Sequence, residues 1–207
     1  MLVRPGRSAT TPSSEGSPLP SFGLRWLWQY LEDVPRPQLL DCGPIHASTM
    51  RVLLARCGRL HRGDLVSPLE RHEPALWDRS GKSPLFLTDL LLDYLPDISA
   101  GSLSVIFAWQ LFDLVPRDAI ADLVLRFHRL IEPGGVLFCL LREPRLDKGA
   151  DADWQLEDLT EMIRTREGAK QFTYSALTNR DLDRLIPTGS VKTFLTRSGW
   201  REVLVVK

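Results

Sequence analysis

The sequence predicts an α/β fold: an open, mostly parallel sheet with helices on both faces and one antiparallel strand near its C-terminal end. Short apolar runs typical of buried strands alternate along the chain with segments whose apolar residues recur at helical spacing. Such alternation is typical of parallel strands that are joined by helices. The last segments instead predict two strands joined tightly near Ser198 and Gly199, and this hairpin supplies the antiparallel strand.

The composition is that of a globular protein with a sizeable core. The chain has 207 residues, of which 43% are hydrophobic and 25% charged. Residues 1–20 are mostly Pro, Ser, Thr and Gly, which predicts a disordered tail before a single domain over 21–207. Lys and Arg number 26, as do Asp and Glu, so the net charge is zero. This balance gives no indication of a nucleic-acid partner, because proteins that neutralise phosphates usually carry a basic excess.

Several features favour a cytoplasmic protein without a membrane partner or a metal. No apolar run approaches the roughly 18 residues that a membrane-spanning helix needs, and the first residues lack the apolar region of a secretory signal. Cys42, Cys57 and Cys139 lack CxxC spacing and are odd in number, so we expect buried, reduced thiols. The histidines show no metal-ligand spacing.

An amphipathic accessory helix is predicted over 22–33, within the segment 21–34. Phe22, Trp26 and Tyr30 recur every four residues, and the apolar face that they form is widened by Leu24, Leu27, Trp28 and Leu31. We expect this helix to cover the sheet of its own domain. The alternative is that the three aromatic side chains form a surface for a partner.

The first two predicted strands each end at an acid. The apolar run 38–42 contains Asp41, and the alternating run 59–65 ends near Asp64. The segment between them predicts a helix that begins with Ser48 as its N-cap and ends at a glycine. This part of the chain is therefore expected to form one strand–helix–strand unit.

The middle of the chain contains one ambiguous segment and two clear ones. Residues 66–84 are polar and interrupted by Pro and Gly, with one short helix expected around 70–77. The apolar stretch 85–95 fits a helix or a strand equally well. By contrast, 102–111 predicts a buried strand and 117–131 a helix whose apolar residues recur at helical spacing.

The C-terminal third adds a strand over 136–143 after an EPGG turn, and a helix over 175–186. The charged segment 144–174 lies between them, with a helix expected around 156–166. This segment, which includes Trp154, could be a lid over a site or a solvated surface helix.

In open α/β sheets the ligand site lies beyond the carboxyl ends of the strands, where the strand order reverses. This rule indicates the turn over 41–48 after the first strand. It also indicates Asp64 and Leu65 after the second strand, and Trp109 and Gln110 after the strand in 102–111. We expect these residues to meet at one edge of the sheet.

Motifs in this order resemble those of class I S-adenosylmethionine-dependent methyltransferases. They read LLDCGPIHAS, RLHRGDLVSP, LSVIFAWQLFDLV and HRLIEPGGVLF. The closing stretch RDLDRLIPTGSVKTFLTRSGWREVLVVK fits the last strand pair of the family, so the resemblance covers about residues 38–207. Within the family, the chain is most similar to bacterial proteins of unassigned substrate whose first motif reads DLGP. The resemblance implies a Rossmann-like sheet and S-adenosyl-L-methionine as the cofactor.

The resemblance also implies which residues contact the cofactor. Asp64 would accept the ribose hydroxyls, Asp41 would lie near the amino group, and the turn amides with Ser48 would receive the carboxylate. The full set is Asp41, Gly43, Ser48, Asp64, Leu65, Asp93 and Trp109. Asp41 and Asp64 could instead bond only to loop amides, and Trp109 could either stack on a ligand or pack under the following helix.

The first motif departs from the family pattern, which would place glycines at 43, 45 and 47. Only Gly43 is present, because Ile45 and Ala47 occupy the other positions. A residue other than glycine at a left-handed position costs about 1–2 kcal/mol. Ile45 could also fill space meant for the cofactor. Ser104 replaces the acid of the fourth strand, and Gln110 replaces a frequent acid beyond it.

Two functions are compatible with these residues. The first is methyl transfer to an unidentified small-molecule acceptor, in which positioning supplies much of the rate and few catalytic residues are needed. His46 and Gln110 are candidates for a catalytic role, although His46 could be a loop histidine without one. The alternative is a catalytically inactive methyltransferase fold that serves as a binding or scaffold protein. A nucleotide-binding dehydrogenase would need GxGxxG after the first strand, which is absent.

Overall fold

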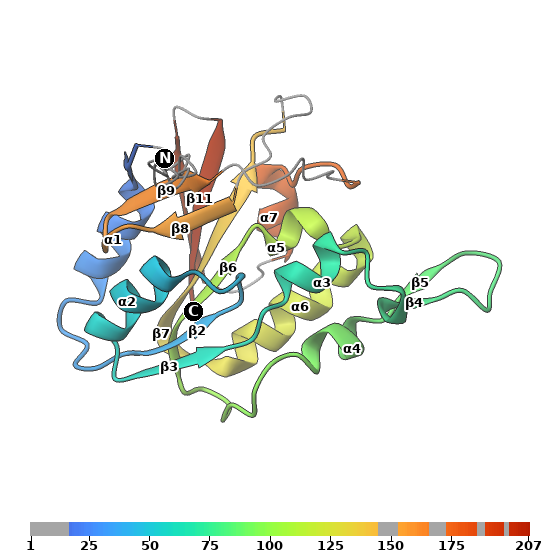
Figure 1. Ribbon diagram of the computed structural model, residues 1–207, viewed down its shortest axis with the longest axis horizontal. Helices are drawn as coiled ribbons and strands as arrows, with labels where there is room; N and C mark the ends of the chain where they lie inside the picture. Colours follow the sequence, from blue (N-terminus) through green and yellow to red (C-terminus); the bar gives the residue numbers. More distant parts are fainter. Residues whose placement is uncertain (1–16, 145–152, 166–172, 186–188, 197–198) are drawn as a thin grey trace, which may run out of the picture.

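The computed structural model describes residues 17–144, 153–165, 173–185, 189–196 and 199–207 (Figure 1). Its centre is a six-stranded sheet. In spatial order the strands are β10 (Ser190–Leu195), β11 (Trp200–Val206), β7 (Ile131–Arg142), β6 (Leu103–Trp109), β2 (Gln38–Asp41) and β3 (Arg59–Arg62). β11 runs antiparallel to both of its neighbours, and the other pairs are parallel. The predicted mostly parallel sheet with one antiparallel strand is therefore confirmed.

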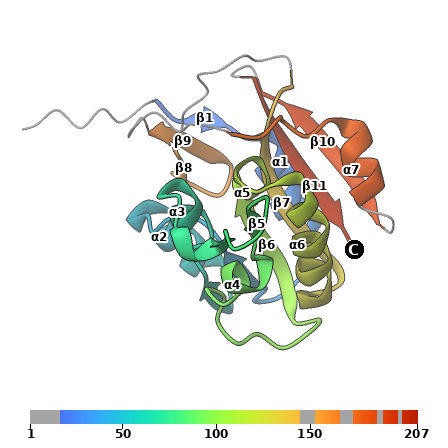
Figure 2. The same ribbon diagram turned by 90° about the vertical axis from the view of Figure 1, so that its right-hand side faces the viewer.

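Helices cover both faces of this sheet, as predicted (Figures 1 and 2). One face carries α1 (Phe22–Tyr30) and α2 (Ala47–Arg56). The other carries α3 (Val66–Glu70), α4 (Thr88–Leu92), α5 (Leu111–Leu114), α6 (Arg117–Leu130) and α7 (Asn179–Leu185). Side chains of β6 alternate between the two faces: Val105 and Phe107 join one apolar cluster, and Ile106 and Ala108 join the other. None of the helices in the described part of the chain combines the length and apolar character that crossing a membrane requires.

A second, smaller sheet lies against α2 and overturns one prediction. It consists of β1 (Leu19–Pro20), β9 (Glu161–Thr165) and β8 (Asp153–Leu156), all antiparallel. The helix expected around 156–166 is wrong. Trp154 and Leu156 alternate with more exposed residues and are buried, so this acidic segment has the period of a strand. Leu19 and Pro20, expected in a disordered tail, form β1 instead, because β9 of this distant hairpin supplies their partner; residues 1–16 of the expected tail lie outside the described residues.

α1 confirms the predicted helix, and it buries the leucine side of the predicted apolar face. The residues that it buries against the sheet are Gly23, Leu24, Leu27 and Trp28, followed by Leu31. Phe22 and Tyr30 are 54% and 43% exposed, and Trp26 stacks on Tyr30 at 4.9 Å on the outer side. Both sides of the helix are apolar in sequence, and the side with the leucines packs against the sheet.

The boundaries of several other elements differ from the predicted ones. The N-cap of α2 is His46, two residues before the predicted Ser48, whose hydroxyl donates to Gln155 on β8 instead. The ambiguous stretch 85–95 contains both a strand and a helix: β5 (Leu85–Phe86) pairs with β4 (Trp77–Asp78), and α4 follows. Before β4, α3 and the short 3₁₀ helix η1 (Pro74–Leu76) replace the single helix expected around 70–77.

The EPGG turn lies inside β7 as a bulge. Leu103 pairs with Ile131, but Val105 pairs with Val136, so the residues in between leave the ladder. Gly134 has a φ of +81°, a conformation that side chains rarely adopt. A Cβ on Gly135 would lie 2.8 Å from the carbonyl oxygen of Leu103. The two glycines thus let the chain turn tightly against β6.

Candidate active site at the switch point of the sheet

The strand order reverses between β2 and β6. From β2 the chain passes outward to β3 on one side and then returns to β6 on the other side. Asp41 ends β2 and Trp109 ends β6, so both stand at the carboxyl edge of this point. The Cys42 amide donates to the carbonyl oxygen of Phe107 at 3.0 Å, which joins the two strand ends. Sequence reasoning expected the ligand site here.

Trp109 lies directly on the turn that follows β2. Its Nε1 donates to Asp41 Oδ1 at 2.7 Å, and the side chain is 5% exposed. A Cβ on Gly43 would lie 2.6 Å from Trp109 Cδ1, so only a glycine leaves room for the indole. The φ of Trp109 is +49°, which costs a residue other than glycine about 1–2 kcal/mol. The strain at this site therefore falls on Trp109.

Asp41 is buried and satisfied by its own surroundings. Besides the Trp109 bond, Oδ1 accepts the Gly43 amide at 3.1 Å, and the side chain is 1% exposed. Arg62 Nε lies 3.8 Å from Oδ2, and Arg62 Nη2 donates to the Gly43 carbonyl at 3.0 Å. Burial raises the pKa of Asp41, and the two hydrogen bonds and Arg62 oppose that rise. Nothing in the local sequence around Arg62 indicates this role, since it arises only from the β2–β3 pairing.

The turn after β2 corrects two expectations. Positive φ values do not occur at Gly43, Ile45 or Ala47, so replacing the second and third glycines causes no backbone strain. Ile45 is 74% exposed, so its side chain does not fill the space above Gly43. The side chain that fills this space is Trp109, which follows a different strand.

At the start of α2, two side chains are already hydrogen-bonded, whereas the first backbone amides have no partner within the helix. Ser48 Oγ donates to Gln155 at 2.9 Å, and Thr49 Oγ1 accepts the Leu156 amide at 2.9 Å. The first intrahelical bond runs from the Met50 amide to the His46 carbonyl, so the preceding amides have no partner within the helix. His46 Nε2 is buried and has no hydrogen-bond partner in the described structure. This helix end can receive an anionic group.

Asp64 and Leu65 have structural contacts at the second strand end. Asp64 Oδ1 accepts the amides of Val66 and Ser67 at 3.1 and 2.9 Å, and Oδ2 accepts the Ser67 hydroxyl at 2.6 Å. These bonds cap α3. Leu65 is fully buried, and its amide donates to the Cys42 carbonyl. Asp64 remains half-buried, and a carboxylate has lone pairs beyond those used here.

The other predicted site residues lie apart or are enclosed. Asp93 is exposed at the end of α4 and faces Arg126 and Leu130, on the C-terminal half of α6, rather than the switch point. Gln110 is 3% exposed and follows Trp109 into α5, where its carbonyl accepts the Asp113 amide.

A buried charged network, which sequence reasoning missed, lies next to the site, at the carboxyl ends of β6 and β7 and the amino end of β11. Asp113 is fully buried and accepts the Arg142 amide at 2.7 Å, with Arg142 Nε 3.6 Å from its other oxygen. Arg201 donates to the carbonyls of Arg142 and Leu177, and to Asn179 Oδ1. Burial raises the pKa of Asp113, and both arginines counteract it. The network ties the segment before α7 to the edge of the sheet.

Within the described ranges, no group of three or more His, Cys, Asp and Glu side chains is arranged to hold a metal ion. Cys42, Cys57 and Cys139 are free thiols. Burial raises the pKa of all three.

Comparison with known proteins gives a likeness in structure alone. No protein-family model matches the chain, and no curated protein matches it significantly. An S-adenosylmethionine-dependent methyltransferase from Mesorhizobium loti is 12% identical, with a TM-score of 0.50 over 88% of this chain and 96% of that chain. The 1,6-didemethyltoxoflavin-N1-methyltransferase of Burkholderia thailandensis is 17% identical, with a TM-score of 0.47 over 90% and 79%. The chain has the fold of S-adenosylmethionine-dependent methyltransferases.

In this methyltransferase fold, the predicted site residues divide into three groups. Asp41, Gly43 and Trp109 meet in direct contact at the switch point. Ser48 and Asp64 stand beside it, at the starts of α2 and α3. Asp93 belongs to a different group of elements. The local sequence could place acids at strand ends, but it carried no signal that Trp109 turns back onto Gly43.

Proposed function

We propose that the protein binds S-adenosylmethionine at the switch point between β2 and β6 and transfers its methyl group to a small-molecule acceptor. One observation carries the proposal: three groups suited to an amino-acid ligand converge there. They are the open amides at the start of α2, the buried carboxylate of Asp41 and the unpartnered Nε2 of His46. The fold, shared with the Mesorhizobium loti methyltransferase, supports the same position.

In this proposal, the residues of the chain mainly bind and orient. The amides of Ser48 and Thr49 receive a carboxylate, because a helix N-terminus favours negative charge. Asp41 faces the amino group, and Asp64 uses its remaining lone pairs for the ribose hydroxyls. The cofactor supplies an electrophilic methyl group. Holding an acceptor in line with it is worth up to about 7–11 kcal/mol, so no strong base is needed.

Trp109 has to move for a ligand to reach Gly43. The left-handed backbone costs about 1–2 kcal/mol and favours release. The buried bond to Asp41 contributes about 0.5–1.5 kcal/mol, or more where a charged acceptor takes part, and opposes release. The burial of the indole and its packing on Phe107 and Phe138 also oppose release. Trp109 therefore lowers the affinity for a ligand that has to displace it.

The experiment is calorimetric titration of the protein with S-adenosylhomocysteine, together with Asp64→Ala and the matched surface control Asp122→Ala. We expect micromolar binding by the wild type and by the control, and strongly weakened binding by Asp64→Ala. The absence of binding at millimolar ligand would contradict the proposal, because even a site worth about −4 kcal/mol binds in that range.

A second candidate function, an inactive binding or scaffold protein, is favoured by the contact between Trp109 and Gly43. In that case the indole permanently replaces the ligand, and Asp41 and Asp64 have structural roles only. The exposed side chains of Phe22 and Tyr30 would then offer an aromatic surface. Trp109→Ala separates the two functions: a scaffold whose site is otherwise lost stays unable to bind S-adenosylhomocysteine after this substitution.

For the setting of this activity, we place the protein in the cytoplasm. The free thiols of Cys42, Cys57 and Cys139 support this, because reduced cysteines are typical of that compartment. The balanced charge of the chain supports a small-molecule partner rather than a nucleic acid.

A further inference from the structure

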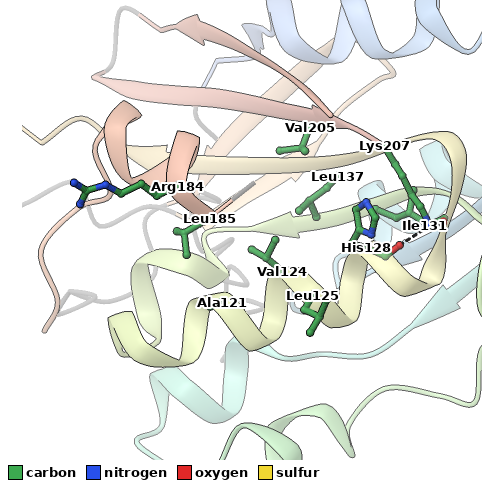
Figure 3. A pocket seen from close by; sticks show the side chains of 10 residues that line it. All are labelled: Ala121, Val124, Leu125, His128, Ile131, Leu137, Arg184, Leu185, Val205 and Lys207. Atoms are coloured by element: carbon green, nitrogen blue, oxygen red, sulfur yellow. Dashed lines mark hydrogen bonds between the residues drawn. The ribbon is translucent and has the colours of Figure 1, made fainter. Parts of the chain in front are cut away.

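A cavity of about 360 Å³ lies between α6 and α7, on the opposite face of the sheet from α1 and α2 (Figure 3). Its walls are aliphatic, and four elements supply them: Val124 from α6, Leu137 from β7, Leu185 from α7 and Val205 from β11. Among the described residues that line it, none is Phe, Tyr or Trp. Leu137 and Val205 are almost fully buried, so the floor of the cavity is the apolar sheet itself.

This cavity is separate from the switch point. Lys207, at one end of the cavity, directly follows β11, whose last residues pair with the start of the regular part of β7 at Val136. Trp109 instead pairs further along β7, with Cys139, towards the carboxyl edge. A ligand in the cavity would therefore contact none of the residues proposed for methyl transfer.

One lysine and one histidine form the polar end of the cavity. Lys207 and His128 stand together at one end (Figure 3), while no Asp or Glu occurs among the described residues that line it. Lys207 Nζ donates to the carbonyls of His128 and Ile131 at 2.8 and 2.7 Å, and an ammonium has a third proton to donate. The whole protein carries no net charge, so this local excess does not follow from its composition.

Arg184 is different, although it also lines the cavity. In Figure 3 its guanidinium extends away from the other labelled side chains, and the residue is exposed. Its aliphatic stem covers the apolar wall while the charge stays in water. The cationic end that faces the cavity is therefore the Lys207 end.

We propose that this cavity binds a medium-chain aliphatic carboxylate, a free fatty acid, with its chain along the Val124 and Leu185 walls and its carboxylate at Lys207. An apolar site with one convergent polar group is the usual form of a small-molecule site. The aliphatic walls match an alkyl chain, and the Lys207 ammonium matches an anionic head group. Lys207 keeps its two carbonyl bonds and gives its third proton to the ligand.

The first test compares octanoate with octanol, which has the same alkyl chain and no charge, by calorimetric titration of the full chain. We expect saturable octanoate binding with a submillimolar dissociation constant. Octanol should bind at least about tenfold more weakly, because charge-assisted hydrogen bonds are the stronger ones. Equal affinity for the two compounds, or octanoate heats that do not saturate, would overturn the proposal.

The second test locates the site with three variants whose folding is checked by thermal unfolding. Lys207→Gln retains a donor for the helix carbonyls but removes the charge, and it should weaken octanoate binding about tenfold without changing octanol binding. Val124→Phe fills the cavity and should weaken both. Arg180→Gln, at an exposed position of α7 outside the cavity lining, is the matched control and should change neither. Full octanoate affinity in Lys207→Gln would overturn the proposal, even if Val124→Phe failed to fold.

Discussion

The switch-point site at the end of β2, here called the crevice, and the cavity between α6 and α7 differ in whether their charged groups already have partners of opposite charge. At the crevice, the carboxylate of Asp41 is already bonded to Gly43 and Trp109, and Arg62 lies beside it. At the cavity, Lys207 has carbonyl partners, and no Asp or Glu side chain occurs among the described lining residues. The proposed cofactor site at the crevice thus has its polar groups already bonded, whereas the proposed carboxylate site in the cavity keeps a donor available at Lys207.

The difference shows that the position of a site in the fold and the availability of its polar groups for a ligand are separate properties. A site whose polar groups are satisfied internally must break those contacts before it binds, and the apparent affinity falls by the fraction of molecules in the open state. A preformed apolar cavity has no such cost. The crevice should therefore respond to substitutions that release Trp109, and the cavity to substitutions that change its charge or volume.

The largest expected effect concerns the rigid framework beside the crevice. Asp113→Ala removes a buried carboxylate and leaves Arg142 and Arg201 without it, which should lower the free energy of unfolding by about 3–5 kcal/mol. Urea denaturation measures this. Asp122→Ala, on the exposed side of α6, should change stability by less than about 0.5 kcal/mol. A small loss in Asp113→Ala would mean that the network does not stabilise this edge of the sheet.

The next effect tests the contact between the turn and the indole. Gly43→Ala introduces a Cβ 2.6 Å from Trp109 Cδ1, and this overpacking should cost about 1–3 kcal/mol in urea denaturation. Gly81→Ala is the control, because its Cβ would meet nothing closer than 3.7 Å. In a Trp109→Ala background the cost of Gly43→Ala should disappear. A cost that persists there would show that Trp109 is not the obstacle.

A smaller effect tests whether Trp109 opposes the ligand. Trp109→Phe preserves an aromatic ring beside Phe107 and Phe138 but cannot donate to Asp41. Losing a bond worth about 1 kcal/mol should raise the affinity for S-adenosylhomocysteine about fivefold to tenfold in calorimetry. Trp28→Phe, which removes an indole nitrogen without a hydrogen-bond partner, should leave the affinity unchanged. A weaker complex with Trp109→Phe would indicate that the indole contacts the ligand instead of blocking it.

The smallest effect is a pH dependence on the cavity side. Burial and the nearby Lys207 ammonium lower the pKa of His128 below its ordinary value of 6.5. The unfolded chain therefore binds this proton first, and stability is lost as the pH falls from 6.5 through the lower pKa of the folded protein. His128→Gln should flatten this part of a plot of melting temperature against pH. Curves that stay parallel to the wild type below pH 6.5 would refute the assignment.

Local patterns were sufficient for most of the sheet and for the long helix. The strands β2, β6 and β7 and the helix α6 carry continuous or periodic apolar residues within one segment. The acids at the ends of the strands were visible for the same reason. The prediction was wrong in the segment 153–165, where β8 and β9 form a hairpin and β9 also pairs with residues 19–20, far away in the chain.

By itself, then, the sequence determined the α/β class, the order of the strands along the chain and the edge where Asp41 and Trp109 meet. Only the tertiary structure decided that the indole of Trp109 lies on Gly43, that Ile45 faces solvent and that Lys207 stands at an apolar cavity. The physical reason is the separation along the chain between the residues that interact. Periodicity and turn chemistry depend on neighbours in the chain, whereas the satisfaction of a buried polar group depends on whichever side chain the packing of the sheet brings to it.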